Sequence, residues 1–479
     1  MPSSPDRRYV ILGGGPCGLA AAWHLAKRGM KPLVLEGEPL LGGLCATHAQ
    51  QGWRFDLGGH RFVSGSTELT RWLEDLLGDD LLEQERRSVI LHEGRTFRYP
   101  LEARDLLENL GVRENARALG GYARVSVEAA LGRRPPARSF EEWVTARFGR
   151  PLYDAFFGPY TEKLWGIHPS TISADWAAER ISLLHLGDAL VRMLGVPRPE
   201  IRTYARRYLY PRRGMGQLYE AIGADIVRMG GEIRRGARVT RLEVEGSRVV
   251  ALWAGENDAQ RIPVGELLST ISLPSLARML HPKKIAAPLA EAAGRLRFRS
   301  LVFLNLLLAR SDFSENTWMY VASKRLKISR IQEPKRRSPD MAPPGRTSLM
   351  LEIPCAHGDE TWNAPVDVLK PKMLAELRSL GIVLDDVTDA FIVRVENGYP
   401  IYHLGYEDDR QRVLADVARF TNVRTAGRQG LFRYIFMDAA MEMGICAAES
   451  MIAGEGRLPQ IDAIGRKKSG VLETQALTA

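Results

Sequence analysis

The amino-acid sequence predicts an α/β fold built from two interleaved domains, and three observations predict it. Residues 9–36 run as a short apolar strand, a glycine-rich turn, a helix and a second strand. A largely helical stretch follows, from about Ser66 to Glu200, and strands then return in two further groups. A chain of 479 residues exceeds one ordinary hydrophobic core, so this order indicates that one domain is inserted into another.

The N-terminal unit predicts a Rossmann-like, doubly wound parallel sheet. Tyr9–Leu12 is a continuous apolar run, and Leu19–Arg28 has the composition of a helix that ends at Gly29. Pro32–Leu35 is a second apolar run, closed by Glu36. A strand, a helix and a strand of these lengths form one right-handed βαβ unit, whose two strands are parallel and buried.

The later elements follow from the period of the apolar residues. Helices are expected at Thr67–Leu77, Leu101–Leu110, Arg113–Leu131, Phe140–Phe148 and Ala174–Leu194, with strand alternation around Ser88–Tyr99. Pro211–Gly231 predicts a turn and a helix. Strands that return to the first domain are expected at Glu232–Leu242, Arg248–Trp253, Leu267–Ile271 and Asn422–Thr425. A second, mixed sheet is expected from Arg297–Leu307, Trp318–Tyr320, Lys327–Gln332, Ser348–Ile353 and Asp389–Val395. Residues 333–346 predict a charged loop, and Asp438–Ala453 a last helix.

Charge and cysteine content narrow the class of protein. The formal net charge is +9, which suits an anionic substrate, peripheral contact with a membrane surface, or simply arginines on solvated faces. No nucleic-acid-binding module is recognisable. The four cysteines form neither a CxxC pair nor a Cys/His cluster, so we expect no metal site. With no signal peptide and no apolar run long enough to span a bilayer, a cytoplasmic protein is expected. No feature indicates an oligomeric state.

The glycine-rich turn predicts a dinucleotide site. Gly13, Gly15 and Gly18 form a GxGxxG pattern between a strand and a helix. Gly13 permits the tight turn, Gly15 lets the backbone approach a pyrophosphate at the helix N-terminus, and Gly18 permits close packing of helix on sheet. Glu36 lies about twenty residues further on, where it can accept hydrogen bonds from an adenosine ribose.

Four segments together resemble the flavoprotein amine-oxidase superfamily, which implies FAD as the cofactor. Gly42 and Gly43 form a second glycine turn after the acidic residue. Residues 55–62 resemble the segment whose backbone, here at Gly59, passes close to the isoalloxazine. Val239 heads a strand as in flavoproteins whose adenine packs there. The fourth segment contains Gly427 and Asp438, and the resemblance implies a contact of Asp438 with the ribityl chain or phosphate.

This resemblance divides the chain into domains. An FAD-binding domain is expected from residues 1–75, 205–285 and 410–455, and a substrate domain from 76–204 and 286–409. The substrate domain would contain the helical insertion and the mixed sheet. Residues 456–479 are polar and aperiodic, so a flexible tail is expected.

Three shorter stretches resemble UDP-galactopyranose mutases more closely. They are the YTEKLWG segment 160–166, the segment 433–438 and the Gly-Gly-His turn 58–60. Four features depart from that pattern. Pro159 replaces a glycine, Arg61-Phe62 replaces Ile-Phe-His, Leu44 stands where those enzymes commonly carry Asn, and the chain is longer than typical bacterial mutases. The resemblance therefore extends to the scaffold rather than to the substrate.

The resemblance supplies candidate residues for the chemistry. His60 and Arg433 are the candidate catalytic residues. The candidate substrate-binding residues are Arg61, Tyr160, Lys163, Trp165, Tyr402 and Tyr434. Each has an ordinary structural alternative: Trp165 as a core aromatic, Lys163 as a solvated cation at a helix end, and Tyr402 at a sheet edge.

Two enzyme functions from different classes stay open, beside a non-catalytic flavin-binding protein. The first is an FAD-dependent oxidoreductase in which a hydride passes from an organic substrate to flavin N5. The second is a mutase-like isomerase that acts through reduced flavin on a nucleotide sugar, with Arg433, Arg61 and Lys163 on the diphosphate. Because Arg61-Phe62 departs from the mutase pattern beside the expected flavin face, net redox chemistry is favoured. The small-molecule substrate, anionic if a nucleotide sugar or a lipid-linked compound, should lie at the domain junction.

Overall fold

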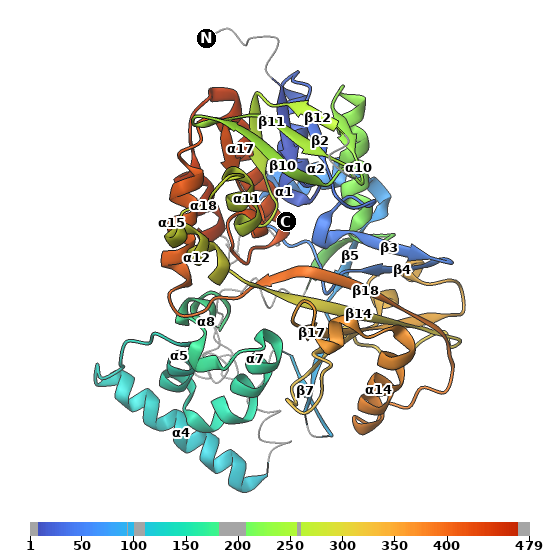
Figure 1. Cartoon of the computed structure of the whole chain (residues 1–479). Coiled ribbons are helices and arrows are strands. Elements are labelled where there is room, and N and C mark those ends of the chain that lie inside the picture. The colour runs from blue at the N-terminus through green and yellow to red at the C-terminus, as the bar shows by residue number, and fades with distance from the viewer. Residues whose placement is uncertain (1–7, 93, 100–110, 182–206, 256–259, 468–479) are drawn as a thin grey trace.

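The computed structural model describes residues 8–92, 94–99, 111–181, 207–255 and 260–467. A parallel sheet with its helices occupies one end of the molecule, and a larger mixed sheet with a helical group occupies the other (Figure 1). This arrangement agrees with the predicted α/β class and with the predicted mixed sheet. The residue bounds of the two domains stay a prediction.

The parallel sheet is assembled from distant parts of the chain. Its strand order is β19 (Val423–Thr425), β13 (Glu266–Ser269), β1 (Tyr9–Leu12), β2 (Leu33–Leu35) and β9 (Glu232–Arg234). All four residues of β1 are buried, as their continuous apolar sequence predicts. Because parallel neighbours need long crossovers, this sheet can close only after residue 423 has been placed.

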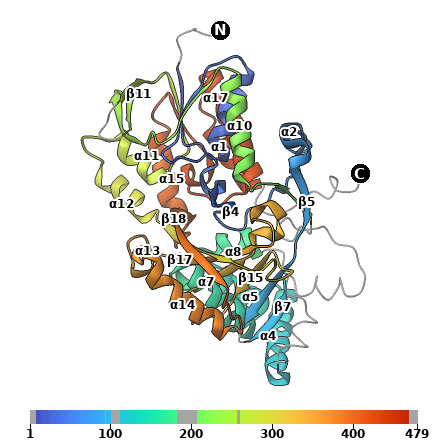
Figure 2. The ribbon, with the colours of Figure 1, turned by 90° about the vertical axis from the view of Figure 1, so that its right-hand side faces the viewer.

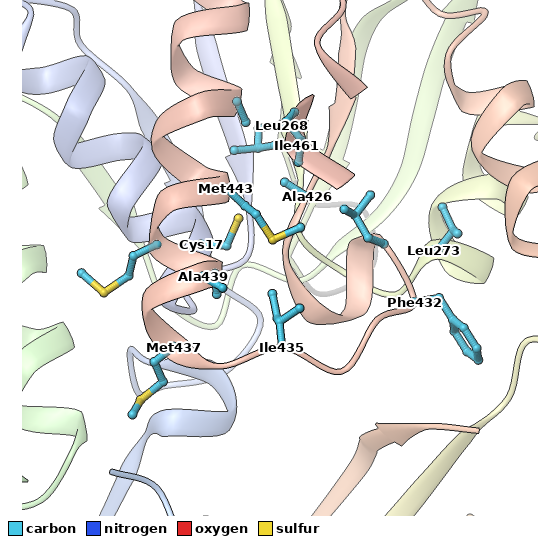
Figure 3. Packing of buried hydrophobic residues seen from close by; sticks show 14 of the residues in the cluster. Cys17, Leu268, Leu273, Ala426, Phe432, Ile435, Met437, Ala439, Met443 and Ile461 are labelled. Carbon is cyan, nitrogen blue, oxygen red and sulfur yellow. The ribbon is translucent and has the colours of Figure 1, made fainter. Parts of the chain in front are cut away.

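Helices pack against this sheet and against one another. They are α1 (Pro16–Lys27), α2 (Thr67–Leu77), α10 (Gly216–Arg228), α11 (Leu273–Leu280), α12 (Ala287–Arg295), α15 (Tyr406–Val417), α16 (Gly427–Gly430), α17 (Met437–Ala453) and α18 (Leu458–Lys467). Helices α1 and α17 pack most closely, because a Cβ at Gly444 would overlap the backbone oxygen of Cys17. Figure 3 shows Cys17 against Ala439 and Met443 of α17, with Ile461 of α18 in the same core.

The mixed sheet has seven strands. Their order is β18 (Val387–Pro400), β14 (Phe298–Leu308), β17 (Thr347–Cys355), β16 (Arg330–Gln332), β15 (Trp318–Val321), β6 (Ser88–His92) and β7 (Arg95–Arg98). Only β15 and β6 pair in parallel among these neighbours, so the sheet is mixed as predicted. Helix α14 (Val366–Ser379) covers one face with Leu369, Met373 and Leu377, and α13 (Glu360–Asn363) precedes it.

Smaller elements complete the fold. Three strands form an antiparallel sheet, β10 (Val239–Glu245), β11 (Arg248–Ala254) and β12 (Gln260–Pro263). Two strand pairs are β3 (Thr47–Gln50) with β4 (Trp53–Asp56), and β5 (Leu81–Glu85) with β8 (Arg207–Pro211). The helical group contains α4 (Val112–Ala130), α5 (Phe140–Phe148), α6 (Arg150–Leu152), α7 (Gly158–Trp165) and α8 (Ala174–Ile181). No helix within the described ranges is long and apolar enough to span a bilayer.

Several expectations from the sequence are corrected. Residues 458–467 form helix α18 against α17, although this region was expected to belong to a flexible tail. The helix was not predicted because its apolar face is short. Strands β5 and β8 were also missed, since neither alternates clearly and they pair with each other across more than 120 residues of chain. The expected helix at 101–110 and the second half of the one at 174–194 lie outside the described residues.

The loop 333–346 is partly buried, and two of its charged side chains, Glu333 and Arg337, are fully buried. The Glu333 carboxylate accepts hydrogen bonds from the backbone N–H groups of Phe313 and Ser314 and from the Thr347 hydroxyl. Arg337 is fully buried and donates to the Gln332 side chain. A charged loop of this kind can be buried because protein groups replace the water that its charges lose.

Helix α18 is attached through a buried ion cluster. Arg410, fully buried in α15, donates to both carboxylate oxygens of Asp462 at 3.0 and 3.1 Å and to both oxygens of Glu407. Burial by itself would raise the pKa of Asp462, but the hydrogen bonds and charge of Arg410 lower it to about 2, with smaller contributions from Arg433 and Arg466.

We expect Asp462→Asn to lower the free energy of unfolding by roughly 3 kcal/mol, because it leaves the buried Arg410 charge only partly neutralised. The carboxylate stabilises the fold fully above an ordinary Asp pKa of 3.8, and this contribution is lost as the pH falls towards 2. Urea denaturation across pH 3–7 measures it. The exposed pair of Glu243 with Arg261 is the control, and Glu243→Gln should change stability by less than about 1 kcal/mol. Equal urea midpoints for Asp462→Asn and wild type would contradict this role.

Candidate active site

A cavity of about 620 Å³ opens at the carboxyl ends of β1 and β2 and extends to the mixed sheet. From the first domain it is lined by the two glycine turns, Glu36, the start of β10 and the region from Gly427 to the start of α17. From the mixed sheet it is lined by residues 393–397 of β18, and His60 lies between the two groups. Its volume is in the range of sites that hold organic ligands, and the ends of parallel strands are where such ligands bind.

The first glycine turn has the geometry that its sequence predicts. Gly13 has φ +101°, a left-handed conformation that favours glycine, and its N–H donates to the Leu35 oxygen at 2.9 Å. A Cβ at Gly18 would overlap the Gly13 oxygen, so Gly18 permits α1 to approach the turn. A Cβ at Gly15 would meet only Gly42 O at 3.9 Å and Gly43 Cα at 4.0 Å. Gly15 is therefore dispensable for protein packing and instead leaves open space in the cavity wall.

Glu36 lines the cavity beside the first glycine turn. Its carboxylate accepts the Gly14 N–H at 2.6 Å and the Glu38 N–H at 2.8 Å. Burial raises the pKa of Glu36, and these backbone hydrogen bonds oppose the rise. A carboxylate has about four acceptor positions, so two remain for hydroxyl groups of a ligand.

The second glycine turn packs directly on the first. The Gly42 N–H donates to the Gly14 oxygen at 2.8 Å, and both Gly42 and Gly43 have positive φ angles. A Cβ at Gly43 would lie 3.3 Å from Gly15 Cα. The two turns thus present backbone N–H groups and a helix N-terminus to the same space, which suits a pyrophosphate.

The remaining predicted cofactor residues lie around the same cavity or next to it. Val239 and Gly427 line it, and a Cβ at Gly427 would approach Cys17 Cβ to 3.0 Å. Asp438 is buried in the first turn of α17 and borders a small adjacent space together with Arg61 and Phe436. An elongated dinucleotide fits this set of glycines, carboxylate and helix N-termini.

His60 stands where the cavity meets the mixed sheet. A Cβ at Gly59 would come within 2.7 Å of Arg330 Nη1, so glycine there allows the turn to lie on this arginine. Burial, together with the charges of Arg428, Arg337 and Arg330, lowers the pKa of His60 to about 3. The imidazole is therefore neutral near pH 7. Its Nδ1 is buried and has no hydrogen-bond partner among the described residues.

A polar triad lies beneath His60 and was missed by sequence reasoning. Arg330 pairs with Glu352 at 2.5 Å, and the Tyr399 hydroxyl donates to the same carboxylate at 3.2 Å. Glu352 is almost fully buried on β17, where its neighbours are apolar. A carboxylate inside an apolar strand was the available signal, because such a charge requires a paired partner.

Three of the four predicted aromatic residues, Trp165, Tyr402 and Tyr434, belong to one cluster of rings. Trp165 is buried against Trp176 with ring centroids 4.5 Å apart, and it contacts Tyr399 at 5.9 Å. Tyr434 stacks on Tyr399 at 5.6 Å, under the Arg428 guanidinium. Tyr402 is buried and stacks on Tyr406, and Tyr160 meets Tyr320 edge to face. None of the four predicted aromatic residues lines the cavity.

Lys163 is not placed to bind a substrate. Its Nζ donates to the backbone oxygens of Val321, Ser323 and Ile328 at 2.5, 2.9 and 2.8 Å. Burial lowers the pKa of Lys163 to about 7, so its ammonium form depends on these acceptors. All three ammonium hydrogens are used, and the side chain ties α7 to the connection between β15 and β16.

Arg433 is likewise placed away from the cavity. It is buried and its Nε donates to Asp462 at 3.2 Å, within the ion cluster that attaches α18. The catalytic role of Arg433 stays a prediction, and the contact with Asp462 gives the side chain a structural role. Sequence reasoning could not see this, because the acidic partner lies in the segment expected to be a flexible tail.

Arg61 is held among aromatic rings and other cations. Its guanidinium lies 5.9 Å from the Trp318 ring centroid, and Arg86 lies 5.3 Å from the same ring. Burial, with a smaller contribution from the Arg86 charge, lowers the pKa of Arg61 to about 10. Arginines gathered in this way attract negative charge.

Comparisons with known proteins give the family. The model of the family described as flavin-containing amine oxidoreductases matches residues 16–452. The phytoene dehydrogenase of Streptomyces griseus is 26% identical over 424 residues, which cover 78% of this chain and 78% of that protein. The coproporphyrinogen III oxidase of Propionibacterium freudenreichii is 22% identical over 451 residues, which cover 85% of this chain and 83% of that protein.

Solved structures share the fold. Reduced UDP-galactopyranose mutase is similar with a TM-score of 0.81 and 21% identity, over 96% of this chain and 98% of that chain. Cyclohexylamine oxidase from Brevibacterium oxydans has a TM-score of 0.66 and 16% identity, over 94% of this chain and 99% of that chain. At these identities the likeness concerns the fold alone, whereas the family match spans most of the sequence. The chain therefore belongs to the family of flavin-containing amine oxidoreductases, and it is a flavoenzyme with FAD as its cofactor.

Proposed function

We propose that the protein is an FAD-dependent oxidoreductase that removes a hydride from an organic small molecule carrying an anionic group. One observation carries the choice between the two functions that the sequence left open. The isomerase function would place Arg61, Lys163 and Arg433 on a substrate diphosphate. Lys163 is instead bonded to three carbonyl oxygens and Arg433 to Asp462, so two of these three cations are committed to the fold.

Bound FAD supplies a two-electron acceptor, and the chain supplies binding and electrostatics. The two glycine turns would hold the pyrophosphate, and Glu36 the adenosine ribose. Neutral His60 would offer a hydrogen bond at the junction without adding charge. Arg428, which lines the cavity, and Arg330 beside it place positive potential around His60. This potential supports an anionic group on the substrate.

The isomerase stays the second candidate because a specific observation favours it. The mutase structure has the higher TM-score of the two similar structures described above, and the YTEKLWG segment forms α7 beside the site. Against it, both relatives compared by sequence carry the names of redox enzymes.

We expect Gly15→Ala to weaken FAD binding by at least about tenfold while the protein stays folded. The protein leaves room for this methyl group, so weaker FAD binding would mean that the methyl group occupies space that the cofactor needs. Purified wild type should be yellow, and acid precipitation should release its FAD into the supernatant. Gly294→Ala, where a Cβ meets nothing within 4 Å, is the control. Retention of stoichiometric FAD by Gly15→Ala would show that the pyrophosphate lies elsewhere.

We expect oxidised enzyme to be bleached anaerobically by its substrate, with a product two hydrogens lighter. The measurement is flavin absorbance together with product mass, against a panel of amines, anionic lipids and sugar nucleotides. An isomerase would behave differently, since it starts and ends with reduced flavin. Activity that appears only after dithionite reduction, with product mass equal to substrate mass, would replace the oxidoreductase by the isomerase.

We expect His60 to contribute no ionisation to the pH profile of kcat/KM between about pH 5 and 8, because its pKa of about 3 keeps it neutral there. His60→Gln, which keeps a neutral hydrogen-bonding group, should lower kcat/KM yet preserve the shape of the profile. The substrate found by anaerobic bleaching serves for this measurement. The opposite result would be a change of kcat/KM with an apparent pKa near 6.5 that is present in wild type and absent in His60→Gln. The imidazole would then titrate as a catalytic base.

A further inference from the structure

Helix α4 turns an apolar face towards solvent. Val112, Leu119, Val127 and Leu131 are 89, 53, 58 and 60% exposed. They make up half of the eight large apolar side chains that are exposed in the described chain. Soluble proteins scatter such side chains singly, so a concentration on one helix indicates a contact surface.

The exposed residues share one side of the helix. Positions 112, 116, 119, 123 and 127 recur at spacings of three and four, and they are Val, Ala, Leu, Ala and Val. All five are exposed, so they form a continuous stripe along the helix. We call this stripe, with Leu131 at its end, the α4 apolar face.

The opposite side of α4 packs on the protein. A Cβ at Gly121 would come within 2.8 Å of Pro151, so the helix approaches the start of α6 closely there. Val125 and Glu128, on the same side, are half-buried. Ala118, Tyr122 and Ala129 are half-buried as well, so the inner side is largely apolar and the exposed stripe is a second apolar face of the helix.

Arginines flank the α4 apolar face. Arg113 and Arg117 are exposed along one edge and make no ion pair with any described residue, and Arg124 pairs only with Glu128 of the same helix. Arg133 and Arg134 follow directly after the helix and are exposed. Between residues 112 and 138 six arginines stand against two glutamates, a local charge of +4.

The position of α4 leaves this face accessible. It is an outermost element at the end of the molecule away from the parallel sheet, in both orientations of the ribbon (Figures 1 and 2). Like the other helices of the described residues, α4 is not long and apolar enough to cross a bilayer. A helix of this kind lies in the plane of an interface.

We propose that the α4 apolar face docks the enzyme peripherally on the surface of an anionic lipid bilayer. The apolar stripe enters the boundary between headgroups and acyl chains, and the flanking arginines extend to the phosphates. Lipid is favoured over a second copy of this chain, because the same cationic edge would meet itself across a symmetric dimer.

The experiment is sedimentation of the FAD-loaded protein with vesicles of phosphatidylcholine containing 30% phosphatidylglycerol, against pure phosphatidylcholine. Wild type should bind the anionic vesicles at low salt and dissociate as salt is raised. Leu119→Glu/Val127→Glu should weaken binding by at least about tenfold. The control Val227→Glu/Val383→Glu changes two equally exposed valines elsewhere and should bind as wild type does.

A second pair of variants tests the contribution of the arginines to vesicle binding. Arg113→Gln/Arg117→Gln should weaken binding by roughly tenfold, whereas Arg71→Gln/Arg278→Gln removes the same charge from other helices and should have little effect. Flavin content and melting temperature confirm that each variant is folded. The proposal is overturned if the wild type stays in the supernatant. It is also overturned if the Leu119→Glu/Val127→Glu protein binds as well as the control. Light scattering that shows a wild-type dimer dissociated by the same variant, without vesicle binding, assigns the face to a second copy.

Discussion

The fold depends on two places where backbones pack in direct contact, both at glycines near the first turn. Helix α1 can approach β1 only because Gly18 has no side chain, and α17 can approach α1 only because Gly444 has none. These contacts set the position of two helix N-termini relative to the sheet. Since both N-termini border the cofactor cavity or the space beside it, the electrostatics of the site depend on these glycines.

Buried charge is the second organising feature, and the chain uses it for architecture as well as for the site. Arg410 and Arg433 join α15 and α18 through Asp462, and Lys163 joins α7 to the mixed sheet. Each buried cation has several acceptors, because an unpaired one would cost several kcal/mol of desolvation. The arginines near His60 differ in that carboxylates balance them only in part. The potential they leave is what favours an anionic group in the adjoining cavity.

The cavity joins two parts of the protein with different roles. The side made by the parallel sheet consists of backbone turns and a single carboxylate, which suits a constant cofactor. The side made by the mixed sheet carries the Arg330, Glu352 and Tyr399 triad, whose side chains can differ without disturbing the glycine turns. Relatives named as acting on different substrates can therefore share one scaffold.

The sequence by itself determined the βαβ unit, the glycine turns, Glu36, the family and most elements of the mixed sheet. These features follow from local rules, namely apolar period, glycine sterics and the spacing of an acidic residue. Only the tertiary structure decided that Lys163 and Arg433 serve the fold, that residues 458–467 form a helix, that His60 stays neutral and that the apolar face of α4 points outward. Each of these depends on partners outside the local segment, 29 residues away for Arg433 and 158 for Lys163, or on which side of a helix is covered. No local pattern encodes either.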